Sequence, residues 1–473
     1  MCRRCRVVAG PSDQVLTAAQ MRAAEQALID GGTRVEAMMQ RAGRGAAEWV
    51  WRLSCGRSVT VLTGPGNNGG DGWVIAEAIR NRGGDVAVVM AAEPATAAAK
   101  TARSGYSGLV SETDTRRHAE VFVDCLFGTG LTRPLRADHA ALLARLAASH
   151  HKRVAIDLPS GIEANFGQPL NHDLPDYDLT VGLGAWKSTH FLMPAAASMG
   201  RLRLVGIGVE PVEGSAQVIT QPQLYPPGPD AHKYTRGLLG VVAGSMPGAA
   251  LLAALAAQGA GAGYVKLYGS VPQGVPADLV CNPQPLAHAL TDKRLSAILI
   301  GPGLGRDGAA REALAIALSE QRPTVLDADA LVLLAPRSLT ERSAPLIATP
   351  HEGELASLEH AFGLDGAGSK VDRAVALAKA ANMVVVAKGP DSVVAAPDGR
   401  VAYAPRASSW LSTAGTGDVL AGTIASRLAC GEDTFEAACQ GVWLHAEAAR
   451  LGGAAFSAGQ LASVIRSAVA SCL

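Results

Sequence analysis

Short apolar runs alternate with amphipathic stretches along most of this chain, a pattern typical of alternating strands and helices. In the first half, Thr17 and Gln20 form a possible capping box before a segment of helical period, and a second helix is expected at about 35–53. Strands are expected at 59–63, 85–90, 120–124, 154–157 and 202–209. Between the first two strands we expect a glycine-rich loop at 64–72 and a helix at 73–80. This order predicts a βαβ unit.

The second half shows the same alternation. Strands are expected at 238–243, 297–300, 324–326, 346–348, 383–387 and 393–395. Nearly all of them end in a polar or glycine-rich turn, and a helix is expected after most of them. This pattern predicts a mostly parallel sheet with helices on both faces. The sequence therefore predicts an α/β protein with two doubly wound domains, the first of them Rossmann-like.

The length of the chain indicates more than one domain, and its charge limits the kinds of partner that it could bind. A chain of 473 residues is too long for one hydrophobic core. A proline-rich stretch divides it into a domain at 14–212, a linker at 213–230 and a domain at 231–473. The chain has 42 basic and 42 acidic residues, so it lacks the excess of positive charge that is typical of proteins that bind nucleic acid or an anionic membrane. The longest apolar stretch, 248–263, is interrupted by Gln258 and is too short to span a bilayer.

Eight cysteines are scattered along the chain. Only Cys2 and Cys5 have the spacing of metal ligands, and no second pair accompanies them, so no zinc site is expected. Reduced thiols and a cytoplasmic location are the expectation.

The most informative stretch lies near the C-terminus, where Ser-Thr-Ala-Gly-Thr-Gly-Asp at 412–418 precedes an apolar helical run. Small residues leave backbone N–H groups uncovered at the positive end of a helix, which is typical of an anion cradle. Asp418 is its one carboxylate, and it would repel a bound phosphate. We interpret it as a catalytic base. The alternative is an aspartate that only favours the helix dipole.

Three turns in the first half carry polar side chains at the ends of expected strands. Gly64, Gly66 and Gly69 fit a dinucleotide-binding pattern with Glu93 as a ribose ligand, but this match alone is weak. The pattern leaves the polar side chains at 67, 68 and 71 unexplained. Asp124 and Asp157 end the next two strands, and each could simply cap a turn. Three such turns at one sheet edge indicate a ligand site.

Polar residues follow the expected strands of the second half as well. Lys388 could neutralise a phosphate, although a lone lysine is more often solvated. His351 could bind a ligand or be structural, and Asp327 and Asp329 could assist a metal or cap a helix. No Walker motif occurs in the sequence, so a nucleotide would be held in another way.

Taken together, these motifs resemble a known family. Gly-Pro-Gly-Asn-Asn-Gly-Gly-Asp-Gly at 64–72, Asp-Cys-Leu-Phe-Gly-Thr-Gly at 124–130 and Asp-Leu-Pro-Ser-Gly at 157–161 resemble the NAD(P)H-hydrate epimerase domain. Residues 231–473 resemble the ADP-dependent NAD(P)H-hydrate dehydratase, a relative of the ribokinase fold. The motifs of that half are His-Lys at 232–233, Gly-Ser at 244–245, Gly-Pro-Gly-Leu-Gly at 301–305, Asp-Ala-Asp-Ala-Leu at 327–331, Thr-Pro-His-Glu-Gly-Glu at 349–354, Lys-Gly at 388–389 and Ala-Gly-Thr-Gly-Asp at 414–418.

The resemblance implies repair of NADH and NADPH that have been hydrated at C6 of the nicotinamide ring. The first domain would interconvert the R and S hydrates, with Asp157 as acid and base. Hydrate-binding residues implied there are Asn67, Asn68, Gly69, Gly70, Asp71, Gly128, Thr129, Gly130, Leu131, Thr132, Arg133, Pro134 and Asp157. A potassium ion would be held by Asn68, Asp124 and Ser160.

The second domain would dehydrate the S form after phosphorylation of its hydroxyl, with ADP as co-substrate and Mg²⁺ accompanying the nucleotide. Asp418 would be the base in this step. The implied hydrate-binding residues are Ala249, Gly305, His351 and Asp418. The implied nucleotide-binding residues are Lys388, Gly389, Pro390, Asp391, Ser392 and Gly417. The expected partners are NADHX and NADPHX, with no nucleic acid or membrane, and the chain is expected to form a homo-oligomer.

Two departures from the family pattern and two rival hypotheses accompany this interpretation. Ser-Ser-Trp-Leu-Ser at 408–412 replaces an Asn-Pro-Gly-Met-Ala-like stretch, and Gln40 replaces a glutamate. The chain could instead be a small-molecule kinase, which a stable phosphorylated product would reveal. Alternatively, the first domain could be an inactive nucleotide-binding module, against which the retained Asp157 argues.

Overall fold

The computed structural model describes residues 12–111, 119–272 and 274–473. Cys2 and Cys5 lie outside the described residues. The chain forms two compact units that divide between Gln217 and Val218, within the stretch predicted as a linker. Each unit is described by itself below.

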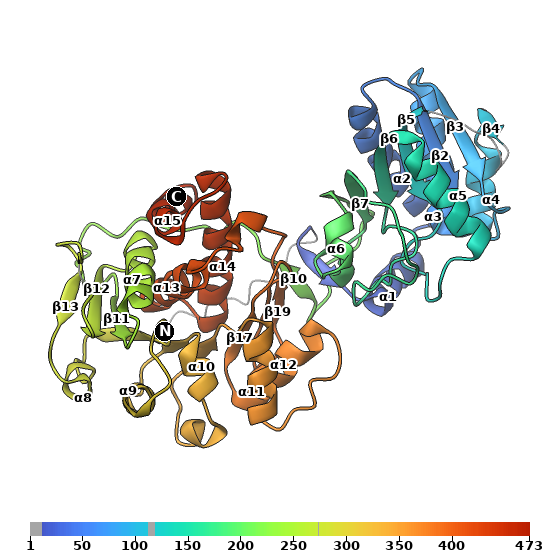
Figure 1. Cartoon of the computed structure of the whole chain (residues 1–473). Helices are drawn as coiled ribbons and strands as arrows, with labels where there is room; N and C mark the ends of the chain where they lie inside the picture. The colour runs from blue at the N-terminus through green and yellow to red at the C-terminus, as the bar shows by residue number, and fades with distance from the viewer. Residues whose placement is uncertain (1–11, 112–118, 273) are drawn as a thin grey trace. The chain divides into compact units, whose positions relative to one another are not determined.

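The first unit is built on a seven-stranded parallel sheet in the order β4-β3-β2-β5-β6-β7-β9 (Figure 1). The strands are β2 (Val59–Thr63), β3 (Val86–Met90), β4 (Leu109–Ser111), β5 (Ala119–Cys125), β6 (His150–Ile156), β7 (Leu179–Leu183) and β9 (Arg201–Val205). The helices are α1 (Ala18–Asp30), α2 (Val35–Ser54), α3 (Asn67–Asn81), α4 (Ala97–Ser104), α5 (Ala137–Ala148) and α6 (Ala195–Ser198), with a 3-10 turn η1 (Ser188–His190). The chain reverses its direction across the sheet between β2 and β5, which defines a topological switch point.

Alternate residues of these strands enter two cores on opposite faces of the sheet. Val61 and Val123 pack with α2, α3 and α4, whereas Leu62 and Phe122 pack with α5. The expected strand at 202–209 is wrong in its length, because β9 ends at Val205.

The glycine-rich stretch after β2 differs from the prediction of a loop. α3 begins at Asn67, six residues before the expected start, so Asn67 and Asn68 lie in its first turn and Asp71 in the next. Its glycines are needed for packing, because a Cβ atom on Gly69 would lie 1.9 Å from the carbonyl oxygen of Gly64 and one on Gly70 would lie 2.4 Å from Met39 Cε. The first helical turn tolerates glycine and asparagine, since its backbone N–H groups lack intrahelical partners.

A short strand precedes α1. β1 (Gln14–Leu16) pairs antiparallel with β10 (Ala216–Val218) and parallel with β8 (Trp186–Lys187). The predicted capping box at Thr17 and Gln20 is confirmed at the start of α1.

The second unit carries a larger sheet. Its strands are β11 (Leu238–Ala243), β12 (Tyr264–Gly269), β13 (Val280–Asn282), β14 (Leu295–Ile300), β15 (Thr324–Leu326), β16 (Leu346–Ala348), β17 (Val384–Ala387), β18 (Val393–Ala395) and β19 (Val401–Tyr403). Their order is β13-β12-β11-β14-β15-β16-β17-β18-β19, parallel up to β17 and antiparallel from β17 to β19. The chain reverses direction between β11 and β14. The sequence missed β12, whose polar Lys266 interrupts the apolar run.

Helices cover both faces of this sheet. On one face α7 (Pro247–Gly259), α13 (Thr416–Ala429) and α14 (Thr434–Gly452) contribute to a core with alternate strand residues such as Val241 and Leu299, and α15 (Ala458–Ala470) lies against them (Figure 1). The other face is covered by α8 (Leu286–Ala289), α9 (Gly308–Ser319), α10 (Asp329–Leu333), α11 (Glu352–Ala361) and α12 (Lys370–Ala381). Two 3-10 turns, η2 (Pro336–Leu339) and η3 (Ser409–Leu411), complete the unit. The predicted α/β class with two doubly wound domains is confirmed.

Within the described ranges, no helix combines the length and hydropathy needed to cross a membrane.

Candidate active sites

The first site lies at the switch point of the first unit. The loops after β2 and β5 meet there, because Gly64 N donates to the carbonyl oxygen of Cys125. Asp157 follows β6 with φ at 64°, a left-handed conformation that costs free energy for a residue other than glycine. Crowding accompanies this strain, since a Cβ atom on Gly128 would lie 2.8 Å from Asp157 Oδ2 and 3.3 Å from Asn68 Cγ. Strain of this kind persists where the surrounding structure fixes a functional group.

Asp157 is held by a buried ion pair. Lys187 Nζ, on a side chain that is 1% exposed, lies 2.5 Å from Asp157 Oδ1 and also donates to the carbonyl oxygen of Leu183 at 2.7 Å. Thr129 donates to Asp157 Oδ2 through its amide at 3.0 Å and through its hydroxyl. His190 Nε2 lies 2.9 Å from the carbonyl oxygen of Asp157, so the backbone is fixed as well. Three donors therefore define the position of this carboxylate.

Two carboxyl groups at this site, those of Asp157 and Asp71, have pKa values shifted in opposite directions. Burial alone would raise the pKa of Asp157, but Lys187 and the two bonds from Thr129 lower it below its ordinary value. Burial raises the pKa of Asp71 well above its ordinary value, and the nearby Asp157 and Glu25 add to the rise. The two carboxyls therefore differ in pKa, that of Asp157 lying below its ordinary value and that of Asp71 above it.

Two of the residues expected to bind potassium, Asp124 and Ser160, contact each other directly. Asp124 is buried and accepts from the Ser160 hydroxyl at 2.7 Å, from the Ser160 amide at 3.0 Å and from the Tyr177 hydroxyl at 2.6 Å. The amide oxygen and nitrogen of Asn68 are buried, and neither has a hydrogen-bonding partner among the residues that the structure describes. A buried oxygen in this state suits a hard cation, which prefers oxygen ligands.

The remaining predicted residues of this unit spread from the site outward. Asn67 accepts a hydrogen bond from Thr96 at 2.7 Å. Gly130, Thr132, Arg133 and Pro134 are exposed and Leu131 is half-buried along the loop after β5. Gln40 is exposed on α2 and accepts a hydrogen bond from Arg44, so its amide replaces the expected carboxylate at the surface.

The second site lies at the switch point of the second unit. The loops after β11 and β14 meet where the amide of Met246 donates to the carbonyl oxygen of Gly303 at 2.9 Å. The predicted anion cradle is the N-terminus of α13, where Gly415 has φ at 90°. The Thr416 hydroxyl donates to the carbonyl oxygen of Leu411 at 2.8 Å and ties the cradle to η3. A Cβ atom on Gly417 would lie 3.6 Å from Lys388 Nζ, so the lysine reaches the cradle.

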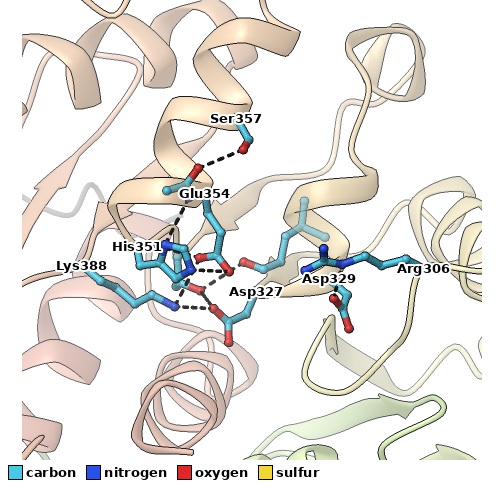
Figure 2. A network of polar contacts seen from close by, with 10 residues as sticks. Arg306, Asp327, Asp329, His351, Glu354, Ser357 and Lys388 are labelled. Atoms are coloured by element: carbon cyan, nitrogen blue, oxygen red, sulfur yellow. Dashed lines mark hydrogen bonds and ion pairs between the residues drawn. The ribbon is translucent and has the colours of Figure 1, made fainter. Parts of the chain in front are cut away.

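A polar network joins this lysine to three neighbouring segments (Figure 2). Lys388 Nζ lies 2.7 Å from Asp327 Oδ1 and 3.9 Å from Glu354 Oε2. The Thr349 hydroxyl also donates to Asp327 Oδ1 at 2.7 Å. Ala328, with φ at 46°, separates this carboxylate from that of Asp329.

The second carboxylate of this segment serves the glycine-rich loop after β14. Asp329 accepts from the amide of Gly305 at 2.9 Å and from Arg306 Nε at 2.7 Å, as Figure 2 shows for the arginine. Both aspartates are therefore engaged, and within the described ranges no group of three His, Cys, Asp or Glu residues could hold a metal ion.

Asp418 differs from its neighbours because it forms no salt bridge with any residue in the described part of the chain. Burial raises its pKa to about 7, the nearby Asp327 adds to the rise, and Lys388 opposes it. A carboxyl that titrates near neutral pH is suited to accept a proton in a reaction. This property favours the catalytic interpretation over an aspartate that only complements the helix dipole.

The other predicted residues of this unit fall into two groups. Ala249 packs beside Gly303, and His351 caps α11 with its side chain 62% exposed and 3.5 Å from Glu354. In the nucleotide stretch, Gly389 N donates to Ser392 Oγ at 3.1 Å, and Asp391 lies 2.6 Å from Lys370. Pro390, between these residues, is exposed.

Sequence reasoning missed the lysines and acids that support these sites. Lys187, Lys370 and Glu354 each hold a predicted residue or the segment that carries it. Lys187 follows β7 by four residues, so the rule of polar residues after strand ends would have found it once that strand was recognised. Lys370 begins a helix, and local sequence gives no signal of its contact with Asp391.

Two family models match the chain. Residues 35–189 match the N-terminus of YjeF-related proteins, and residues 239–470 match NAD(P)H-hydrate dehydratase. Among solved structures, the ADP/ATP-dependent NAD(P)H-hydrate dehydratase of Bacillus subtilis, co-crystallised with ATP and Mg²⁺, is 30% identical, with a TM-score of 0.47. The match covers 53% of this chain and 95% of that one.

Curated relatives match nearly the whole chain. The bifunctional NAD(P)H-hydrate repair enzyme Nnr of Mycobacterium leprae is 35% identical over 92% of this chain and 94% of its own length. The protein of the same name from Thermosynechococcus vestitus is 32% identical, with 92% of each chain covered. These matches confirm the resemblance drawn from the motifs. The chain therefore belongs to the family of bifunctional NAD(P)H-hydrate repair enzymes.

Proposed function

We propose that this enzyme restores NADH and NADPH from their hydrates in two steps. The first unit interconverts the R and S hydrates, and the second dehydrates the S form at the expense of ADP. The observation that carries the proposal is the match to bifunctional relatives over 92% of the chain, which includes both aspartate sites.

Epimerisation requires the C6–O bond of the hydrate to break and to form again on the other face of the ring. The ring nitrogen supplies the electron pair as the hydroxyl leaves as water with a proton from the Lys187–Asp157 pair, and the returning water gives one proton back to that pair. Asp157, ionised beside Lys187, is suited to take that proton. The backbone contact with His190 keeps this carboxylate in place during the exchange.

Potassium is proposed for the first site, with Asn68, Asp124 and Ser160 as the residues that would hold it. The unpartnered Asn68 oxygen supports this assignment. A bound cation there would supply positive charge and would satisfy that oxygen.

Dehydration requires a better leaving group than hydroxide. Asp418 takes the proton of the C6 hydroxyl as its oxygen attacks the β-phosphorus of ADP, which releases AMP. The amides of residues 414–417 and the Lys388 ammonium face the charge that develops on the phosphoryl group. The ring nitrogen then expels phosphate, and loss of a C5 proton completes the dihydronicotinamide.

Magnesium is proposed to accompany the nucleotide. Asp327 and Asp329 do not fit a ready-made magnesium site, because Lys388 and Arg306 already pair with them. No step of the mechanism is assigned to the metal.

We also propose a domain organisation, a set of substrates and a cellular location for this enzyme. Residues 14–212 would form the epimerase domain, 213–230 the linker and 231–473 the dehydratase domain. The substrates would be NADHX and NADPHX, without nucleic acid or membrane partners, in a cytoplasmic homo-oligomer.

A mixture of the two NADHX epimers tests the proposal directly. With ADP and Mg²⁺, the enzyme should restore the absorbance of NADH at 340 nm from all of the hydrate. Consumption of only the S form above the spontaneous rate would exclude an epimerase, and a stable phosphorylated product would indicate a kinase.

A further inference from the structure

The turn that follows β17 is held through the backbone of Lys388. The amide of Lys388 donates to the carbonyl oxygen of Pro350 at 2.8 Å, and its own carbonyl oxygen accepts from Lys370 Nζ at 3.1 Å. Lys370 is the first residue of α12, so its side chain reaches this turn from a segment 18 residues earlier in the chain. Other parts of the unit therefore fix both peptide groups that flank the Cα atom of Lys388.

Lys370 also pairs with a carboxylate at the other end of the same turn. Its Nζ lies 2.6 Å from Asp391 Oδ1, and the two side chains are 15% and 11% exposed. Gly389 leaves room for this pair, because a Cβ atom there would lie 2.5 Å from Lys370 Nζ and 2.7 Å from Asp391 Oδ1. One ammonium group thus joins the two ends of the turn 388–391.

This turn lies within the stretch 388–392 that is expected to bind the nucleotide. A carboxylate without a counter-ion would repel the phosphates of ADP there, and Lys370 neutralises that of Asp391. Lys388 Nζ is directed away from this pair toward the anion cradle, where a Cβ atom on Gly417 would lie 3.6 Å from it. The path of the Lys388 side chain therefore starts from a backbone that Lys370 holds.

We propose that Lys370 is a positioning residue for the nucleotide, which holds the turn 388–391 in the conformation that binds ADP and directs Lys388 at the cradle. This inference rests on the proposed function of the second unit. Lys370 acts through the turn, because its ammonium group is directed at Asp391 and at the carbonyl oxygen of Lys388. Without it the turn can adopt other conformations, so the fraction of the enzyme that is ready to bind ADP falls.

Lys370→Met tests the inference against Lys379→Met, which removes one positive charge from an exposed site on the same helix. Calorimetry with ADP and Mg²⁺ gives the Kd of the nucleotide without turnover, and dehydration assays give the KM of each substrate. We expect the Kd and KM for ADP to rise about tenfold in Lys370→Met, with the KM for S-NADHX nearly unchanged. Lys379→Met should match the wild type, and Lys370→Arg should recover part of the loss.

A double variant separates the position of the turn from its charge. Lys370→Met combined with Asp391→Asn leaves no buried carboxylate unpaired, so it tests the inference even where Lys370→Met alone is unstable. The carbonyl oxygen of Lys388 still lacks its donor in the double variant, so ADP should still bind several-fold more weakly than to the wild type. Wild-type affinity in the double variant would show that Lys370 only neutralises Asp391, and would overturn the inference.

Two further results would also overturn it. One is an unchanged Kd for ADP in Lys370→Met. The other is a loss of affinity for both substrates that follows the melting temperature and that Lys370→Arg does not relieve. The proposed function fails separately: if the wild type binds ADP and Lys370→Met binds it about tenfold more weakly, yet neither dehydrates S-NADHX, the positioning role stands and the dehydratase does not.

Discussion

The two sites use the same pair of residue types, a buried lysine and an aspartate, in opposite ways. In the first unit Lys187 binds the functional Asp157, which stays ionised. In the second unit Lys388 binds Asp327 instead, and the functional Asp418 is left with a pKa of about 7. The partner that the lysine binds therefore decides whether the functional carboxylate is a permanent anion or a group that titrates near neutral pH.

Removal of Lys187 should have the largest effect, because it takes away the counter-ion that distinguishes Asp157 from Asp418. In Lys187→Met, Asp157 would remain buried without its counter-ion, which typically costs about 3–5 kcal/mol of unfolding free energy. The unfolding constant of the first unit should rise by about 10²-fold or more, and epimerisation should be lost. Thermal unfolding of the full chain, with Lys152→Met as an exposed control, measures the difference. An unchanged transition would show that the ion pair does not hold Asp157 in place.

Asp418→Asn should have the next largest effect. The amide keeps the shape of the side chain but cannot take a proton, so kcat for dehydration of the S hydrate should fall about 10²-fold or more. ADP affinity, measured by calorimetry, should hold or increase, because a negative charge beside the phosphates is removed. Epimerisation should be unaffected. Normal turnover of S-NADHX would leave Asp418 only a role at the helix dipole.

The same variant should change stability in a pH-dependent way. A carboxyl whose pKa is raised by folding destabilises the folded state increasingly as pH rises from its ordinary pKa of 3.8 to its folded pKa of about 7, and most strongly above it. Asp418→Asn should therefore melt at a higher temperature than the wild type at pH 8, and the difference should shrink steadily as pH falls toward about 4. Equal melting at pH 8 would contradict the raised pKa.

Asp327→Asn should move the acidic limb of the dehydration pH–rate profile by about one pH unit. Wild-type dehydration should fall about tenfold for each pH unit below 7 as Asp418 is protonated. Loss of the Asp327 charge and release of Lys388 should both lower the pKa of Asp418, so this acidic limb should move to lower pH by about one unit. A pH–rate profile of dehydration measures it, with Asp157→Asn as a control that keeps the wild-type limb.

The smallest expected effect concerns the cation of the first site. Potassium at a hundred times its dissociation constant would stabilise the wild type by about 2.7 kcal/mol relative to a large organic cation. In Asn68→Ala this difference should shrink, while the variant itself loses an unpartnered buried amide. Melting temperatures in the two salts test it, and equal salt dependence in both proteins would remove Asn68 from the site.

Local sequence patterns were sufficient for most strands of the two sheets and for the switch-point loops, because alternating apolar runs and glycine turns carry that information. They gave the wrong start of α3, since only tertiary packing of Gly69 and Gly70 shows that the polar turn is helical. Lys187 was missed because β7, the strand that precedes it, was not recognised, and its contact with Asp157 joins segments 30 residues apart.

α13 carries Asp418 at one end and is buried at every residue from Val419 to Ala429. Gly422 allows this close fit, since a Cβ atom there would lie 2.0 Å from the carbonyl oxygen of Ala253. Asp418 is therefore held by a helix that is packed into the core along the rest of its length. The neighbouring stretch at 408–412 carries a half-exposed Trp410 and meets α13 through the backbone carbonyl of Leu411, so its side chains can change while this contact to the helix is kept.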